Sequence, residues 1–198
     1  MEVLGDQIAF REANGENYCY NHNLNSESIV IELGGNSGTW ISNIIQKFNP
    51  HVYTIEPLQG YYNQLKDRFT NNKVQILKVG IGKENGPGVI YFDDVGSSRH
   101  LPNSNGESVE FVTMEHLLNL WNLTTVDFLN VNIEGDEYDL LEHMIATGIV
   151  SRFKTIQIQF HLIGSDPAGR RSNIQQGLAA AGFTQKYNFD FVWEAWSQ

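Results

Sequence analysis

Short apolar and β-branched runs alternate along most of the chain with stretches of helical periodicity. The strand-like runs occupy residues 29–33, 51–55, 74–81, 88–92, 109–113, 126–133 and 155–161. Several of them are apolar throughout, which is typical of strands buried on both faces of a parallel sheet. The alternation therefore predicts βαβ units with right-handed crossovers, and so a doubly wound α/β fold.

Three helices are expected between these strands, at residues 58–69, 137–148 and 172–183. Each sets apolar side chains along one helical face, as a helix that packs on a sheet requires. The last residues, "FTQKYNFDFVWEAW", predict an antiparallel hairpin about a turn at 188–190. The segment 84–108 is rich in Gly, Ser and Asn around one short strand, so we expect it to be flexible.

The first 28 residues alternate only weakly, in "QIAFRE" and "NYCYNH". We expect residues 1–28 to form a strand pair or a cap over the binding site, and residues 29–198 to form the ligand-binding domain. A length of 198 residues suits one such domain with a full hydrophobic core.

The acidic balance of the chain argues against several classes of partner. The net charge is −10, whereas nucleic acids and anionic membranes are bound mainly through Lys and Arg. We therefore expect a small-molecule or glycan ligand, and no nucleic-acid or membrane partner. Cys19 is the single cysteine and the N-terminus lacks the pattern of a signal peptide, so we expect a cytoplasmic protein. The oligomeric state stays open.

The stretch "IVIELGGNSGTW" (29–40) is the most informative for function. A buried strand that contains Glu32 ends in Gly34, Gly35 and Gly38, and a helix then begins. Glycines let the backbone turn sharply and approach a ligand closely, and the N–H groups of the new helix attract an anion or a polar group. The alternative is a tight turn that needs glycine for its geometry alone.

An acid stands at the end of the next strand. Glu56, followed by Pro57, comes about 20 residues after the glycine turn. In doubly wound folds an acid at this position hydrogen-bonds the ribose hydroxyls of a nucleotide cofactor. NAD and S-adenosylmethionine both carry a ribose, but the Gly-Gly-x-x-Gly spacing lacks the G-x-G-x-x-G of dinucleotide binders and favours S-adenosylmethionine. The alternative for Glu56 is an exposed acid that caps the next helix.

Several pieces of the chain, taken in order, resemble the FkbM family of methyltransferases, a branch of the class I S-adenosylmethionine-dependent fold. They are "IVIELGGNSGTW", "VYTIEP", "ILKVGIGKENG", "VEFVTMEHLL", "VDFLNVNIEGDEYDLL", "IQIQFH" and "LAAAGF". The resemblance covers residues 29–183 and implies a seven-stranded, mostly parallel sheet with an antiparallel C-terminal strand. It also implies S-adenosylmethionine at the carboxyl edge of the sheet, bound by residues 29–198. Members that methylate do so on hydroxyl oxygens, commonly of sugars or of secondary metabolites.

The resemblance assigns roles to particular positions. The family's glycine turn corresponds to Gly34, Gly35, Asn36 and Gly38, and its ribose-binding acid corresponds to Glu56. Its acidic box corresponds to Glu134 and Glu137. The expected cofactor set further includes Glu32, Pro57 and Asn132, together with Val79 and Gly80 against the adenine and Ser97 and Ser98 at its edge.

Three positions depart from the family pattern. The family usually has Lys and Asp where this chain has Asn130 and Asn132, and an acid where it has Gln159. These departures put catalysis in doubt more than cofactor binding. They support an alternative function, in which the protein binds a cofactor or ligand without turning it over.

His161 and Glu134 are the candidate catalytic residues, because each ends a predicted strand at the edge where ligands of open α/β sheets bind. Methyl transfer from a sulfonium needs an aligned acceptor, and a base that takes the hydroxyl proton accelerates it. We expect His161 to be the base, since Asn132 and Gln159 carry no charge that would raise its pKa, with Glu134 orienting the acceptor or sharing the work. We expect no metal, because Asn132 removes a charge that a hard cation would want. His100 is expected to be solvated.

Overall fold

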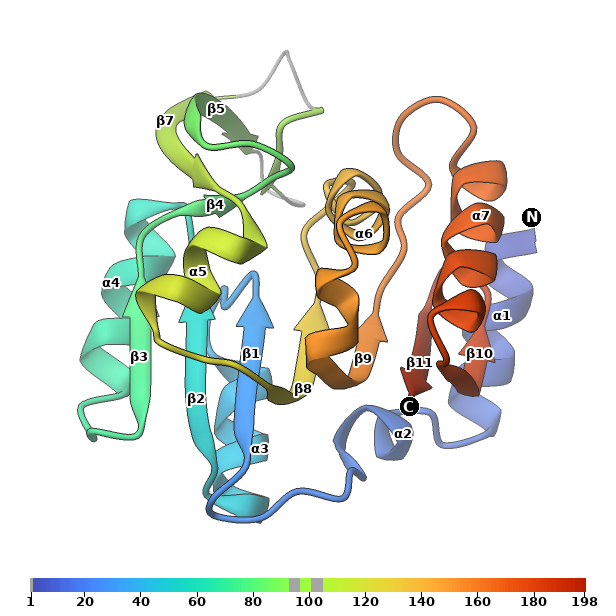
Figure 1. Ribbon diagram of the computed structural model, residues 1–198, viewed down its shortest axis with the longest axis horizontal. Helices are drawn as coiled ribbons and strands as arrows, with labels where there is room; N and C mark the ends of the chain where they lie inside the picture. Colours follow the sequence, from blue (N-terminus) through green and yellow to red (C-terminus); the bar gives the residue numbers. More distant parts are fainter. Residues whose placement is uncertain (1, 93–96, 101–104) are drawn as a thin grey trace.

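A seven-stranded sheet forms the centre of the computed structural model, which describes residues 2–92, 97–100 and 105–198 (Figure 1). In spatial order its strands are β10 (Thr184–Phe189), β11 (Trp193–Ser197), β9 (Phe153–Ile158), β8 (Val126–Val131), β1 (Ile29–Leu33), β2 (His51–Ile55) and β3 (Val74–Leu77). The strands from β9 to β3 run parallel, whereas β11 is antiparallel to both of its neighbours. The prediction of a doubly wound α/β fold with an antiparallel C-terminal strand is confirmed.

Helices cover both faces of this sheet (Figure 1). One face packs against α5 (Met114–Leu120), α6 (Glu137–Ala146) and α7 (Pro167–Ala180), and the other against α3 (Thr39–Phe48) and α4 (Gln59–Arg68). A 3-10 helix, η1 (Ile149–Arg152), leads from α6 into β9. Successive residues of β1 and β8 belong to different cores: Val30 and Phe128 face α3, whereas Ile31 and Leu129 face α5 and α6. Burial on both faces therefore explains the unbroken apolar runs.

Residues 2–28 contain two helices instead of the predicted strand pair. These are α1 (Glu2–Glu12) and α2 (Glu16–Tyr20), and α1 contacts β10. Phe10 packs edge-on against Phe189 with ring centroids 5.2 Å apart, and Cys19 is buried in the same cluster. Phe10 is the one buried side chain among residues 6–12, so the sequence carries no clear helical period there. No side chain of residues 6–28 lines the pocket described below.

A second, four-stranded sheet lies between β3 and α5 along the chain, and the sequence did not predict it. Its strands, in spatial order, are β4 (Gly80–Ile81), β7 (Asn105–Val112), β5 (Gly86–Phe92) and β6 (Ser97–Ser98). The single strand expected at 74–81 is therefore split in two, since β3 ends at Leu77 and β4 starts at Gly80.

The segment 84–108, expected to be flexible, contains all of β5 and the first half of β7, and the two strands pair from Gly86–Phe111 to Phe92–Asn105. The second sheet packs with the start of α4 around a small apolar core, which consists of Leu58, Ile90, Val109 and Phe111. Within that segment, residues 93–96 and 101–104 lie outside the described part of the chain. In the part that is described, no helix combines the length and apolar composition that a bilayer span requires.

Candidate active site

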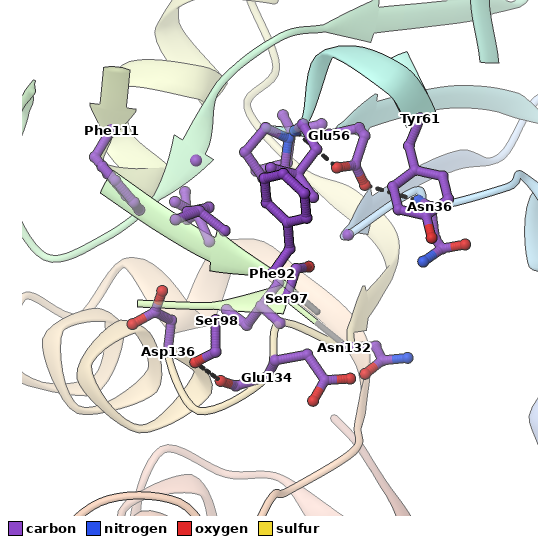
Figure 2. Close-up of a pocket in the computed structure, with 18 residues that line it drawn as sticks. Asn36, Glu56, Tyr61, Phe92, Ser97, Ser98, Phe111, Asn132, Glu134 and Asp136 are labelled. Atoms are coloured by element: carbon purple, nitrogen blue, oxygen red, sulfur yellow. Dashed lines mark hydrogen bonds between the residues drawn. The ribbon is translucent and has the colours of Figure 1, made fainter. Parts of the chain in front are cut away.

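A pocket of about 200 Å³ opens at the carboxyl ends of β1, β2 and β8, next to the second sheet (Figure 2). The predicted site residues that line it are Gly34, Asn36, Glu56, Pro57, Gly80, Ser97, Ser98, Asn132 and Glu134. Residues that were expected in the cofactor set but do not line the pocket are Glu32, Gly35, Gly38 and Val79. Most of the predicted cofactor residues therefore lie together at one pocket, and their contact with a cofactor stays a prediction.

The glycines of the turn after β1 are required by close packing. Gly34 has a φ of +86°, and a Cβ at this residue would lie 2.2 Å from the backbone oxygen of Asn132. A Cβ at Gly35 would meet the Thr54 hydroxyl, and one at Gly38 would meet the ring of Phe69. Gly34 alone of the three borders the pocket, so geometry accounts for the other two glycines.

Glu32 lies beneath this turn and not in the pocket. Its side chain is 2% exposed, and its Oε2 accepts a hydrogen bond from the Thr54 hydroxyl at 3.3 Å. Burial raises the pKa of Glu32 well above its ordinary value, although hydrogen bonds from Thr54 and Asn130 oppose the shift. The geometry therefore does not support the expected contact between Glu32 and a cofactor.

Glu56 is a buried carboxylate at the pocket wall whose orientation is fixed by backbone N–H groups (Figure 2). Its Oε2 accepts from the N–H of Asn36 at 2.8 Å, and its Oε1 accepts from the N–H of Leu58 at 2.9 Å. Burial raises the pKa of Glu56, and these two hydrogen bonds oppose the rise. Each oxygen keeps a lone pair for a further donor, so the group is prepared for a ligand hydroxyl.

Apart from Asp136, the remaining wall of the pocket is apolar, and the sequence analysis did not identify most of it. Its side chains come mainly from the start of α4 and from the second sheet, and they are Ile55, Leu58, Tyr61, Ile81, Ile90, Phe92, Phe111 and Ile133. Gly80 was expected to leave room for a flat ring of the ligand. A Cβ at Gly80 would lie 2.6 Å from the ring of Phe111, so the space is already taken by this protein side chain.

A hydrogen bond and an ion pair hold the segment 97–100 against the turn that follows β8. The Ser98 hydroxyl donates to the backbone oxygen of Glu134 at 2.5 Å (Figure 2). Arg99 binds both oxygens of Asp136, with its Nη2 2.7 Å from Oδ1, and its guanidinium lies over the ring of Phe111. The Ser98 hydroxyl therefore donates within the protein, and is not free to donate to an adenine nitrogen as expected.

His100 also contacts this turn, although its side chain is exposed, as expected. Its Nε2 lies 3.3 Å from Asp136 Oδ1, and this hydrogen bond raises the pKa of His100 above its ordinary value. Residues 100 and 136 are far apart in the sequence, and no pattern along the chain connects them.

Glu134, which lines the pocket, pairs with His161, which does not line it. Glu134 has a left-handed backbone with a φ of +52°, and its Oε1 lies 3.4 Å from Nε2 of His161. On the other side of the ring, Nδ1 lies 3.2 Å from Oε1 of Glu137. Burial lowers the pKa of His161, but the hydrogen bonds to Glu134 and Glu137 outweigh it and raise the pKa to about 9.

His161 is consequently a cation near pH 7, and the expectation of a neutral imidazole is wrong. The sequence argument considered the uncharged Asn132 and Gln159, whereas the carboxylates that contact the ring are Glu134 and Glu137. Glu137 lies at the start of α6, 24 residues before His161, so its contact with the ring depends on the tertiary fold.

Asn132 lines the pocket with an amide oxygen that is buried and has no hydrogen-bond partner within the described residues. Leaving a buried acceptor unpaired is costly, typically by about 1–3 kcal/mol. A ligand that donates a hydrogen bond to this oxygen would remove that cost. The unpaired amide oxygen of Asn132 and the carboxylate of Glu56, held in place by two backbone N–H groups, both fit a polar ligand with several hydrogen-bond donors.

Comparison with known families identifies the chain. The family model described as the methyltransferase FkbM domain matches residues 32–191. The chain belongs to the FkbM methyltransferase family. The resemblance stated from the sequence motifs is therefore confirmed. No curated protein matches the chain in sequence.

Solved structures share the fold of this FkbM domain at low sequence identity. A putative rRNA methylase from Clostridium thermocellum is 9% identical, with 94% of each chain covered and a TM-score of 0.53. Aeropyrum pernix fibrillarin, in complex with S-adenosyl-L-methionine, is 11% identical over 88% of this chain and 69% of its own, with a TM-score of 0.50. A putative caffeoyl-CoA O-methyltransferase from Staphylococcus aureus is 10% identical over 96% of this chain and 83% of its own, with a TM-score of 0.51.

Proposed function

We propose that this FkbM-family protein is an S-adenosylmethionine-dependent O-methyltransferase that acts on a hydroxyl of a sugar, a glycan or another small metabolite. The observation that carries the proposal is the buried carboxylate of Glu56, held by the N–H groups of Asn36 and Leu58 beside the glycine turn. A carboxylate fixed in this way at the end of β2 suits the two hydroxyls of a ribose.

The rest of the pocket suits the other parts of S-adenosylmethionine. The rings of Tyr61, Phe92 and Phe111 supply an apolar wall for the adenine. The backbone at Gly34 and the unpaired amide oxygen of Asn132 lie toward β8 and suit the amino-acid portion, whose ammonium is a donor. Bound here, the cofactor supplies a methyl group that is already activated on a sulfonium.

Glu134 takes the proton of the acceptor hydroxyl in this proposal. With the methyl group supplied by the cofactor, the Glu134 carboxylate would accept the proton that the acceptor hydroxyl loses. His161, cationic because of Glu134 and Glu137, donates to Glu134 and fixes its orientation. The roles expected for the two residues are thus exchanged, because an imidazolium has no lone pair to accept a proton.

A second candidate function is binding of the cofactor without turnover, and the departures from the family pattern favour it. Asn132 is the departure that lies in the pocket. Asn130 is buried within the sheet, and neither it nor Gln159 lines the pocket. Only one of the three departures is therefore placed to affect a bound ligand directly, which supports turnover as the leading function.

Titration calorimetry and a transfer assay test the proposal together. We expect S-adenosylmethionine and S-adenosylhomocysteine to bind the purified protein and NAD not to bind. Radiolabelled methyl groups should then pass from S-adenosylmethionine to at least one member of a panel of sugars and hydroxylated metabolites. Cofactor binding without transfer to any acceptor would favour the second function, and binding of NAD in place of S-adenosylmethionine would refute both.

A further inference from the structure

Two successive residues at the start of α6 hold the backbone of His161. Oε1 of Glu137 accepts a hydrogen bond from the N–H of His161 at 2.8 Å. The hydroxyl of Tyr138 donates to the carbonyl oxygen of His161 at 2.6 Å. Both side chains have an exposed fraction of 0%, so their positions are fixed by the surrounding core. His161, three residues beyond the end of β9, is therefore held at both of its backbone polar groups.

The Glu137 carboxylate also contacts the imidazole and the turn that presents Glu134. Its Oε1 lies 3.2 Å from Nδ1 of His161, and its Oε2 accepts from the N–H of Gly135 at 2.7 Å. Glu134 and Gly135 have φ values of +52° and +106°, so this turn adopts a backbone that few residues tolerate and that needs support. One buried carboxylate therefore fixes the residues on both sides of the contact between Glu134 and His161.

We infer that Glu137 is a positioning residue, which holds the His161 ring with Nε2 directed at Glu134 and holds the turn that presents the Glu134 carboxylate. Its effect on catalysis rests on the proposed function, because the groups it positions are those that handle the acceptor proton. Its effect on the ring itself depends only on the geometry of α6 and the two loops.

The charge on Glu137 is needed as well as its shape. Among the described residues, His161 is the only cationic side chain within ion-pair distance of the Glu137 carboxylate. A buried charge needs such a partner. The other carboxylate that faces the ring is Glu134, from the turn after β8. Across Gly135, His100 is paired with Asp136, and on α7 Arg170 is paired with Asp139 and Glu142. Removal of the Glu137 charge therefore leaves Glu134 as the sole anion in contact with His161.

The variant Glu137→Gln, followed by NMR titration of the His161 imidazole, tests the inference without any assay of methyl transfer. The amide keeps one oxygen acceptor but removes the charge. We expect the titration midpoint of His161 to fall from about 9 toward the ordinary value of 6.5. In the transfer assay, the limb of the pH profile above neutrality should move to lower pH, while the affinity for S-adenosylmethionine stays near that of the wild type.

The chain offers a matched control in a second Glu–His pair. Glu115 lies 3.2 Å from Nε2 of His143 in a partly exposed pair between α5 and α6. Glu115→Gln makes the same chemical change and should leave the His161 midpoint and the pH profile unchanged. An unchanged His161 midpoint in folded Glu137→Gln would overturn the inference.

The wild-type protein provides a second measurement if Glu137→Gln fails to fold. Nitrogen chemical shifts at pH 7 should show both ring nitrogens of His161 protonated, with the Nδ1 proton protected from exchange by Glu137. A neutral ring at pH 7 would overturn the inference. Absence of methyl transfer, with the NMR results as expected, would instead refute the proposed function and leave the positioning role standing.

Discussion

Nε2 of Gln157 donates a hydrogen bond of 2.8 Å to Oδ1 of Asn130 across the neighbouring strands β9 and β8, with both side chains buried in the sheet. The two residues are directly opposite in the strand register. Their positions belong to a transverse row in which Thr54, Glu32, Asn130 and Gln157 stand opposite one another on four parallel strands. Tyr187 on β10 extends the row, since its hydroxyl donates to Oε1 of Gln157 at 2.7 Å.

This row of polar side chains favours one register of the parallel strands, whereas apolar side chains alone would discriminate little between registers. A shift of one residue would bring these polar groups opposite apolar neighbours and leave them unpaired in the core. Asn130, which departs from the family pattern, therefore has a structural partner in Gln157.

Gln157→Leu should lower the free energy of unfolding. The substitution leaves the Asn130 oxygen without its donor and the Tyr187 hydroxyl without its acceptor, at a cost of about 1–3 kcal/mol for each group left unpaired. Urea denaturation followed by circular dichroism measures the change. Gln185→Leu, at an exposed position of β10, is the matched control and should change the stability little. Equal stability of the two variants would show that the row contributes nothing.

Much of the fold could be predicted because its evidence is local. The runs at 29–33 and 126–133 are apolar over successive residues, and the glycine turn and Glu56 each follow a strand, so both the sheet and the pocket edge could be read from neighbouring residues. Strands were predicted at 88–92 and 109–113, but their separation into a second sheet was not, because the pairing of β5 with β7 joins distant residues and buries few side chains.

The electrostatics of the site could not be predicted either, for a related reason. The cationic state of His161 depends on Glu137. The position of residues 97–100 depends on an ion pair between Arg99 and Asp136, which are 37 residues apart in the sequence. Side chains on separate elements determine these contacts, and residue types and spacing along the chain do not reveal them. The sequence located the groups of the site, and the tertiary structure determined their charge.

Glu56→Ala should weaken the binding of S-adenosylmethionine. The ribose hydroxyls would lose their acceptor, which costs roughly 1.5–3 kcal/mol for hydrogen bonds to a charged group. Calorimetry on the wild type and the variant measures the difference. Glu110→Ala, at an exposed position of β7, removes a carboxylate outside the pocket and should bind as the wild type does. Equal affinities for all three proteins would remove Glu56 from the cofactor site.

Chelation should leave methyl transfer unchanged. The described residues contain no group of three His, Cys, Asp or Glu side chains arranged to hold a metal ion. Of the acids near the pocket, Asp136 is occupied by Arg99 and His100, and Glu137 by Gly135 and His161. Rates measured with and without EDTA test this prediction. A loss of activity that magnesium or calcium restores would contradict it.

The pH dependence of turnover separates the two possible bases, because they predict opposite signs. The pKa of His161 is about 9, with burial lowering it and the contacts to Glu134 and Glu137 raising it more strongly. If Glu134 takes the proton while the imidazolium orients it, the rate should be flat up to pH 8 and fall as pH rises through 9. If neutral His161 were the base, the rate should instead rise through the same range.

Stability should follow the same titration. The pKa of His161 is raised above its unfolded value of 6.5, so its ion pairs stabilise the folded state in full below pH 6.5, and this contribution disappears as pH rises through about 9. His161→Gln should flatten this part of the stability profile. It should also lower turnover by about 10²–10⁴-fold if the pair acts as a unit in proton transfer, with cofactor affinity near that of the wild type. A rate within a few-fold of the wild type, with Glu134→Gln equally active, would leave alignment of the acceptor as the catalytic device of the site.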